Sequence, residues 1–182
     1  MKIDKFKHGK VLYTNCMNPE VGLQSLEDNS FDLCLTDPPY GGNYKKKGKV
    51  NYKDTFIGVD WVNEVRRVCK YVLFTPGQVY TFKYPTPDLI IAWYKPAATG
   101  YNMTGGMCNF EPIFYYGSGY RVPIDVIKTK PGAGYMKKYQ HSSPKPMPLY
   151  RKMFNLFRNT SISSIIDPFT GSGTSAQTAI EF

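Results

Sequence analysis

The segment Asp37-Pro38-Pro39-Tyr40 places a carboxylate, two prolines and an aromatic ring in four consecutive positions. Because proline fixes its own φ angle, the Pro38 carbonyl is held rigidly beside the Asp37 carboxylate. These two acceptors could take hydrogen bonds from both N–H groups of an exocyclic base amine and so make its nitrogen a better nucleophile. That amine is paired inside a duplex, so the base would have to flip out, and Tyr40 offers a ring on which it could stack. The simpler alternative is a proline-rich strand terminator with a packing tyrosine.

A second group of residues, Asp167-Pro168-Phe169-Thr170-Gly171-Ser172-Gly173-Thr174, follows an apolar run near the end of the sequence. Gly171 and Gly173 allow a ligand to approach the backbone, and a helix starting here would present N–H groups to a carboxylate. Asp167 could receive an ammonium group. The segment therefore suits a zwitterionic amino acid, such as the methionine part of S-adenosylmethionine, although a bare Gly-x-Gly also fits an ordinary tight turn.

Short apolar runs bounded by turn residues predict strands, and apolar residues at helical spacing predict helices. Strands are expected at 11–14, 31–36, 71–75, 89–94, 112–116 and 164–167, and helices at 19–28, at 60–69 with Asp60 as N-cap, at 148–157 and from near Thr174. This alternation is typical of an α/β fold with a mainly parallel sheet flanked by helices. Both chemical segments follow expected strands. Because such sheets bind ligands at the carboxyl ends of their strands, we expect one shared site.

The chain has 182 residues, of which 42% are hydrophobic, enough for one packed domain without an internal linker. Its net charge of +9 favours a polyanionic partner such as nucleic acid, although a merely basic protein would have the same balance. Four scattered cysteines and only two histidines argue against a metal site and favour reduced thiols in the cytoplasm. We find no apolar run that predicts a signal peptide or a membrane span.

Three motifs in this order resemble the β-group DNA amino-methyltransferases, which methylate adenine N6 or cytosine N4. The family's catalytic motif reads Asp-Pro-Pro-Tyr, as at 37–40, and its cofactor motif reads Asp-Pro-Phe-x-Gly-Ser-Gly-Thr, as at 167–174. Between them the family has His-Pro-x-x-Lys-Pro, which helps to hold the methionine end of the cofactor. The segment His141-Ser142-Ser143-Pro144-Lys145-Pro146 is similar, with Ser142 in place of the first proline. Segments 12–40, 93–96 and 111–113 also resemble the family, so nearly the whole chain is covered.

The resemblance implies a Rossmann-like, S-adenosylmethionine-dependent methyltransferase fold with permuted motif order. It implies a single domain, 1–182, with its catalytic half at about 11–120 and its cofactor half at about 141–182, and no large recognition domain. The catalytic residues that it implies are Asp37, Pro38, Pro39 and Tyr40. The residues that it implies for S-adenosylmethionine are Asn15, Asp37, His141, Lys145, Asp167, Pro168, Phe169, Gly171, Ser172, Gly173 and Thr174.

Two departures from the family pattern concern the cofactor pocket. The family has Gly-Asp near its first strand, where this sequence has Thr14-Asn15, so an adenine edge would meet an amide and not a charge. The family also continues past the last helix to a strand whose acidic residue binds the ribose, whereas this sequence ends at Ile180-Glu181-Phe182. We therefore expect a sheet short of one or two C-terminal strands, in a truncated or decayed chain or in one that a partner completes, for example in a homodimer.

An aspartate at the start of the catalytic motif favours adenine N6 as the target, and cytosine N4 remains the alternative. The expected partner is double-stranded DNA with the target base flipped, and the setting is restriction-modification. The basic residues expected to contact DNA lie in the loop 41–55 and the segment 117–140 and are Lys45, Lys46, Lys47, Lys49, Lys53, Arg121, Lys128, Lys130, Lys137 and Lys138. Two rival functions stay open: an inactive DNA-binding member of the family, and a methyltransferase for RNA or protein amides.

Overall fold

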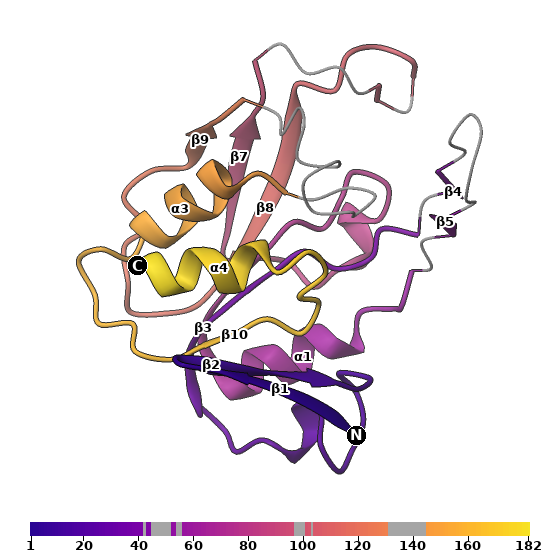
Figure 1. Cartoon of the computed structure of the whole chain (residues 1–182). Coiled ribbons are helices and arrows are strands. Elements are labelled where there is room, and N and C mark those ends of the chain that lie inside the picture. The colour runs from indigo at the N-terminus through magenta and orange to yellow at the C-terminus, as the bar shows by residue number, and fades with distance from the viewer. Residues whose placement is uncertain (42, 45–51, 54–55, 97–100, 103, 131–144) are drawn as a thin grey trace.

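A six-stranded sheet lies at the centre of the fold, in the order β10-β3-β6-β8-β7-β9 (Figure 1). The computed structural model describes residues 1–41, 43–44, 52–53, 56–96, 101–102, 104–130 and 145–182. The strands are β3 (Phe31–Thr36), β6 (Cys69–Phe74), β7 (Leu89–Tyr94), β8 (Phe110–Tyr116), β9 (Val126–Lys128) and β10 (Ile165–Ile166). Only β8 runs against its two neighbours, so the predicted mainly parallel sheet is confirmed.

Helices cover both faces of the sheet, because its central strands carry apolar side chains on both faces. On one face, Leu33 and Leu73 pack with α3 (Met147–Asn155), which contacts α4 (Thr174–Glu181). On the other face, Cys34 and Phe74 pack against α1 (Asp60–Val68). Residues that follow one another along a strand thus belong to opposite halves of the core. The result is the three-layer α/β arrangement that the sequence predicts.

The register of the parallel strands brings their carboxyl ends to one edge of the sheet. Ile166 of β10 lies beside Cys34 of β3, and Thr36 of β3 lies beside Phe74 of β6. The next residues after these strands are Asp167, Asp37 and Thr75. Three polar side chains from distant parts of the sequence therefore meet at this edge.

Several elements differ from those expected. The first expected strand is present as β2 (Gly9–Tyr13), but it pairs with β1 (Lys2–Phe6) in a separate hairpin outside the main sheet. The expected helix at 19–28 is only the short 3-10 turn η1 (Leu23–Ser25), because too few apolar residues there can face the core. The N-cap of α1 is Val59, and Asp60 is its first helical residue.

One further strand pair and one short helix complete the description. The pair is formed by β4 (Asn43–Tyr44) and β5 (Tyr52–Lys53) inside the predicted loop. The strand β9 of the main sheet lies where the sequence predicts no strand. A 3-10 turn, η2 (Thr81–Lys83), follows β6. Within the described ranges, no helix has both the length and the apolar character needed to cross a membrane.

Candidate active site

Asp37 sits directly after β3 at the centre of a hydrogen-bonded cluster. Its Oδ1 accepts hydrogen bonds from the hydroxyls of Tyr40 and Thr75, whose own oxygens are 2.8 Å apart. The Lys145 ammonium lies 2.8 Å from Oδ1 and 2.9 Å from Oδ2. Three donors thus converge on Oδ1, whereas Oδ2 has one donor among the described residues. The carboxylate is held in one orientation with Oδ2 the less occupied oxygen.

Tyr40 is fixed at both ends of its side chain. Its hydroxyl binds Asp37 and lies 2.6 Å from Lys145 Nζ, and the Lys145 ammonium also lies 4.6 Å from the centre of the ring. The ring edge packs on Gly77, where an added Cβ atom would come within 2.8 Å of Tyr40 Cδ1. Burial raises the pKa of the Tyr40 hydroxyl far above its usual range, and the charges of Asp37 and Glu111 add to this. The phenol therefore stays a neutral hydrogen-bond donor.

Lys145 precedes α3 and reaches Asp37 and Tyr40 from the segment that resembles the family's His-Pro-x-x-Lys-Pro element. The resemblance assigns this residue to the methionine end of the cofactor. The structure places its buried ammonium against the catalytic motif, and its contact with the cofactor stays a prediction. The sequence could not reveal this contact, because 108 positions separate the two residues.

Asp167 follows β10 and is bound by neutral donors only, within the part of the chain that the structure describes. Thr36 Oγ1 lies 2.5 Å from its Oδ1, the Phe169 N–H lies 2.9 Å from the same oxygen, and Ser175 Oγ binds Oδ2. Burial raises the pKa of the Asp167 carboxyl group above its ordinary value of 3.8, and these hydrogen bonds oppose the shift. A positive charge beside this carboxylate would offset the cost of its burial.

The loop after Asp167 leads into the N-terminus of α4 through glycines in left-handed conformations, with φ of 49° at Gly171 and 74° at Gly173. An added Cβ at Gly173 would meet no atom within 4 Å, so space is open beside it. No side chain caps α4, and its first backbone bond runs from Gln177 N to Gly173 O. The N–H groups of the first turn therefore suit an anionic group.

Phe169 of the predicted cofactor motif turns into the core. Its ring meets Trp61 of α1 edge-on, with centroids 5.0 Å apart. The contact ties the loop after β10 to α1, the helix that packs on the Cys34 face of the sheet. Phe169 thus helps to position the loop.

Four residues that the sequence reasoning missed contact or face the site. Thr75 binds Asp37, and Thr36 and Ser175 bind Asp167. Tyr150 of α3 is buried near both carboxylates. Its burial, together with the charges of Asp37 and Asp167, raises the pKa of its hydroxyl far above the usual range. Thr75 could have been found, because it follows a buried apolar strand as Asp37 does.

A buried ion pair flanks the catalytic motif where β7 ends and β8 begins. Lys95 and Glu111 have side chains that are only 8% and 18% exposed and are in direct contact. Lys95 Nζ also lies 3.5 Å from Cys108 Sγ, to which Gln78 donates at 3.4 Å. The charge of Glu111 contributes to the raised pKa of Tyr40, which links this pair to the site.

The remaining predicted residues are not all gathered at this edge. Asn15 is exposed, and its side-chain oxygen accepts the Met17 N–H at 3.0 Å in a local turn. Arg121 follows β8, the antiparallel strand, and so lies at the opposite edge, where Tyr120 binds the Leu156 carbonyl. Lys45, Lys46, Lys47, Lys49, Lys137, Lys138 and His141 lie outside the described residues, as does the side chain of Lys53.

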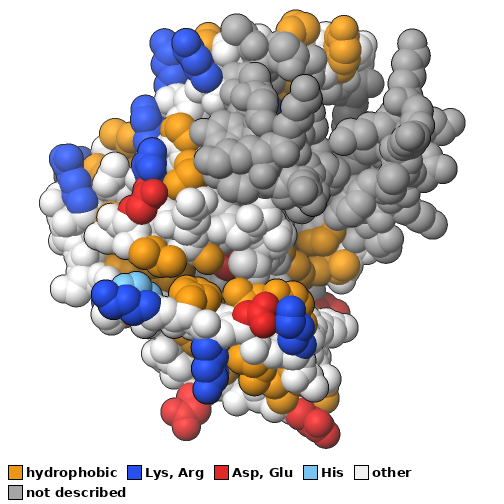
Figure 2. Space-filling model, in the orientation of Figure 1, with side chains coloured by type: hydrophobic (Ala, Val, Ile, Leu, Met, Phe, Trp, Pro, Cys, Tyr) orange, Lys and Arg blue, Asp and Glu red, His pale blue; other side chains and the backbone are white. Residues whose placement is uncertain are grey.

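The surface view in Figure 2 shows Lys and Arg side chains in several separate places and not in one stripe. Lys128 and Lys130 are exposed at the carboxyl end of β9, on the same edge of the sheet as Asp37. Among the described residues, no group of three or more His, Cys, Asp and Glu side chains could hold a metal ion.

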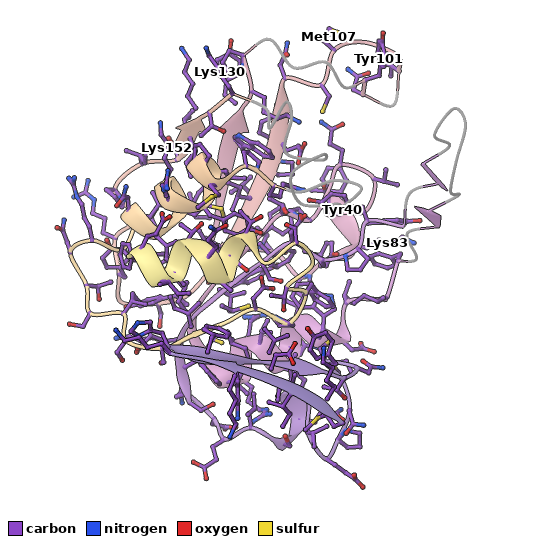
Figure 3. The ribbon with its side chains drawn as sticks, viewed as in Figure 1. Tyr40, Lys83, Tyr101, Met107, Lys130 and Lys152 are labelled. Atoms are coloured by element: carbon purple, nitrogen blue, oxygen red, sulfur yellow. The ribbon has the colours of Figure 1, made fainter. Side chains whose placement is uncertain are left out.

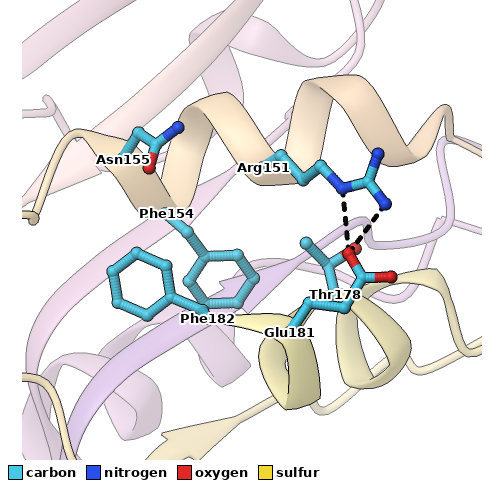
Figure 4. Close-up of a pocket in the computed structure, with 6 residues that line it drawn as sticks. All are labelled: Arg151, Phe154, Asn155, Thr178, Glu181 and Phe182. Atoms are coloured by element: carbon cyan, nitrogen blue, oxygen red, sulfur yellow. Dashed lines mark hydrogen bonds and ion pairs between the residues drawn. The ribbon is translucent and has the colours of Figure 1, made fainter.

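A shallow pocket of about 210 Å³ lies between α3 and α4 (Figure 4). Arg151 and Glu181 form an ion pair of 2.8 Å at its side, and Phe154 stacks on Phe182 with ring centroids 5.2 Å apart. It is lined by Thr178 and Glu181 of α4 and by Phe182 directly after α4, and these lie toward the end of the helix that is remote from Gly173. This pocket is therefore separate from the cluster around Asp37 and Asp167.

Comparison with known proteins agrees with this geometry. No model of a known protein family matches the chain. The chain is 25% identical over 201 residues to the Type II methyltransferase M.MwoI of Methanothermobacter wolfeii, and the match covers 91% of this chain but 29% of that protein. The chain thus spans less than a third of the length of this curated relative.

Solved structures share the fold. The PvuII DNA methyltransferase, described as cytosine-N4-specific, superposes with a TM-score of 0.56 at 13% identity over 87% of this chain and 74% of its own. M1.HpyAVI superposes with a TM-score of 0.55 at 12% identity, over 92% of this chain and 84% of its own. The expected Rossmann-like methyltransferase fold is confirmed. The sequence match and the shared fold together support the resemblance to DNA amino-methyltransferases.

Proposed function

We propose that this chain carries the methyl-transfer site of a DNA amino-methyltransferase, which uses S-adenosylmethionine to methylate the exocyclic amine of a flipped base, with adenine N6 as the favoured target. The observation that carries the proposal is the meeting of Asp37 and Asp167 at the carboxyl ends of the neighbouring strands β3 and β10. Thr36, next to Asp37, binds Asp167 directly. An amine-binding motif and an amino-acid-binding loop thus lie side by side, as transfer between them requires.

The Asp37 carboxylate is suited to receive a base amine. Because Oδ1 already takes three donors, Oδ2 is the oxygen with room for the amine N–H. The Pro38 carbonyl, fixed by two proline rings, is the second acceptor. The amine nitrogen gains electron density from both hydrogen bonds, and its surplus proton leaves through the Asp37 carboxylate after the new N–C bond has formed.

Tyr40 provides the ring on which the flipped base stacks. Base–aromatic stacking contributes roughly 1–3 kcal/mol, and the rigid support from Gly77 lowers the entropy cost of that contact. Since the phenol stays neutral, it continues to donate to Asp37 while the base is bound. Tyr40 therefore has two functions: it stacks the base and orients the carboxylate.

The loop around Asp167 fits the methionine end of S-adenosylmethionine. The carboxylate has no cationic partner among the described residues, so an ammonium beside it is favourable, and the uncapped first turn of α4 suits the carboxylate of the same moiety. Open space at Gly173 allows the approach. When bound, this cofactor supplies the electrophilic methyl group. We therefore assign residues of about 141–182, which include this loop, to the cofactor half of a single domain that spans 1–182.

Cytosine N4 is the alternative target, because the PvuII enzyme with this fold is described as cytosine-N4-specific and the two amines need the same acceptors. An inactive DNA-binding member and a methyltransferase for RNA or protein amides are the further alternatives. The net charge of +9, and the exposed Lys128 and Lys130 at the same edge of the sheet as Asp37, favour a nucleic acid.

Transfer of tritium from methyl-labelled S-adenosylmethionine to unmodified genomic DNA tests the proposal, because such DNA contains every short recognition sequence. The labelled DNA is then digested to nucleosides. We expect label in N6-methyl-2′-deoxyadenosine, and label in N4-methyl-2′-deoxycytidine would select the alternative. RNA that competes better than DNA, or the absence of label from both nucleosides, would contradict the proposal.

A further inference from the structure

Phe82 is the most exposed large hydrophobic side chain in the described part of the molecule, with 99% of its surface accessible. It lies in the middle of η2, the 3-10 turn after β6. Val79, two residues before this turn, is also exposed, at 54%. A phenyl ring held entirely in water gains nothing for folding, because burial of apolar surface is what stabilises the fold. Its position in the molecule therefore needs a separate explanation.

The turn that carries Phe82 is firmly held. Thr81 Oγ1 lies 2.5 Å from the Gly77 carbonyl oxygen, and the Lys83 N–H donates to the Tyr80 carbonyl at 2.9 Å. The ring of Tyr80 stacks on Phe56 with centroids 4.2 Å apart. Phe82 is thus presented to solvent from a fixed backbone and not from a loose chain.

The same turn supports the candidate active site. Gly77, which binds Thr81, is the residue on which the Tyr40 ring packs. Figure 3 shows Lys83 of η2 and Tyr40 on the same side of the molecule. The turn that carries Phe82 is therefore joined, through Thr81 and Gly77, to the ring on which a flipped base would stack.

Lys83 adds a positive charge next to the exposed ring. Its ammonium lies 4.9 Å from the centre of the Tyr80 ring and 5.7 Å from that of Phe56, and its side chain is exposed. A lysine beside an exposed aromatic ring matches a DNA duplex, which offers phosphates outside and stacked bases inside.

We propose that Phe82 is a wedge that enters the base stack of duplex DNA and fills the gap left by the flipped base, while Lys83 contacts a neighbouring phosphate. The proposal rests on the proposed function, since it needs a base-flipping site at Tyr40. Flipping breaks two stacking contacts, and an inserted ring replaces part of what is lost. A single strand has no such gap to fill, so the wedge matters for duplex DNA alone.

The test compares Phe82→Ala with the intact chain on unmodified genomic DNA, used either as native duplex or after heat denaturation. We expect methyl transfer to the duplex to fall at least about tenfold and transfer to the single strands to change less than about twofold. Phe82→Leu, which keeps an apolar wedge, should retain most of the duplex activity. Ile124→Ala is the matched control, because Ile124 is 52% exposed but precedes β9 at the opposite edge of the sheet.

The outcomes separate this inference from the proposed function. Equal losses on duplex and single strands, or no loss on duplex, would overturn the wedge while leaving methyl transfer established. If the intact chain labels neither DNA form, the proposed function fails, and the wedge proposal fails with it. Duplex activity that is lost equally in Phe82→Leu and Phe82→Ala would also contradict the wedge, because leucine still offers an apolar side chain to the gap.

Discussion

The ammonium of Lys145 lies 2.8 Å and 2.9 Å from the two carboxylate oxygens of Asp37, and its own side chain is only 8% exposed. The segment before α3 and the catalytic motif after β3 are therefore parts of one cluster. Lys145 also binds the Tyr40 hydroxyl, so a single cation fixes both side chains that would face the base. Residues that resemble two separate motifs of the family act here on the same carboxylate.

Replacing Lys145 with Met should reduce the free energy of unfolding by about 3 kcal/mol, because it leaves a half-buried carboxylate without its cation. Urea unfolding of the purified variant measures this loss. Adding Asp37→Asn to Lys145→Met should restore most of the stability, since the orphaned charge is then removed. If the double variant instead loses the sum of what Lys145→Met and Asp37→Asn each lose alone, the ion pair does not hold this cluster together.

Replacing Gly77 with Ala should lower methyl transfer more than it lowers stability. The backbone cost of a left-handed φ is about 1–2 kcal/mol for a residue with a Cβ, and the new methyl group would also displace the Tyr40 ring. Gly58→Ala carries the same backbone cost, with φ of 82°, but its Cβ meets no atom within 4 Å. We therefore expect similar unfolding curves for the two variants and a loss of activity in Gly77→Ala alone. Equal activities would show that the position of Tyr40 is unimportant.

Replacing Asp167 with Asn should stabilise the chain at pH 7 and weaken the binding of S-adenosylmethionine. Because burial raises the pKa of Asp167 in the folded chain, the fold favours the protonated carboxyl group, and stability from this group is lost as the pH rises from 3.8 through the raised pKa. The neutral amide avoids that loss. Calorimetric scans should show a thermal midpoint about 2–4 °C higher for the variant at pH 7.

The same two proteins at pH 3.5 provide the control for this effect. There Asp167 is mostly protonated in both the folded and the unfolded chain, so the difference between the midpoints should become small. Isothermal titration should show at least about tenfold weaker binding of S-adenosylmethionine to Asp167→Asn at pH 7. A variant that binds the cofactor as well as the intact chain would remove Asp167 from the proposed pocket.

Much of the fold could be predicted because its strands are continuous apolar runs that end at polar or turn residues. This pattern predicts that Asp37 and Asp167 each follow a strand and share one site, but it does not predict that their strands, β3 and β10, are neighbours. The direction of β8 could not be predicted, because Phe110–Tyr116 has buried side chains on both faces in either direction. The contact of Lys145 with Asp37 was hidden for a different reason, since no local pattern records which distant carboxylate a lysine reaches.

Replacing Lys130 with Ala should weaken binding to duplex DNA, whereas Arg121→Ala should not. Lys130 is exposed near the carboxyl end of β9, on the edge of the sheet that carries Asp37, and Arg121 lies at the opposite edge. If Lys130 contacts a phosphate, its loss should reduce the slope of log affinity against log salt by about 1. Fluorescence anisotropy across a salt series measures both variants, and a reduced slope for Arg121→Ala alone would contradict this orientation of the DNA.

The most direct test of the central claim compares the intact chain with Asp37→Ala in two assays on the same protein preparations. One assay measures labelled methyl groups transferred to genomic DNA, and the other measures the dissociation constant for S-adenosylmethionine. Because Asp37 is assigned to the base amine and Asp167 to the cofactor, we expect Asp37→Ala to lose transfer while its dissociation constant changes less than about threefold. Methyl transfer that persists in Asp37→Ala would contradict the account.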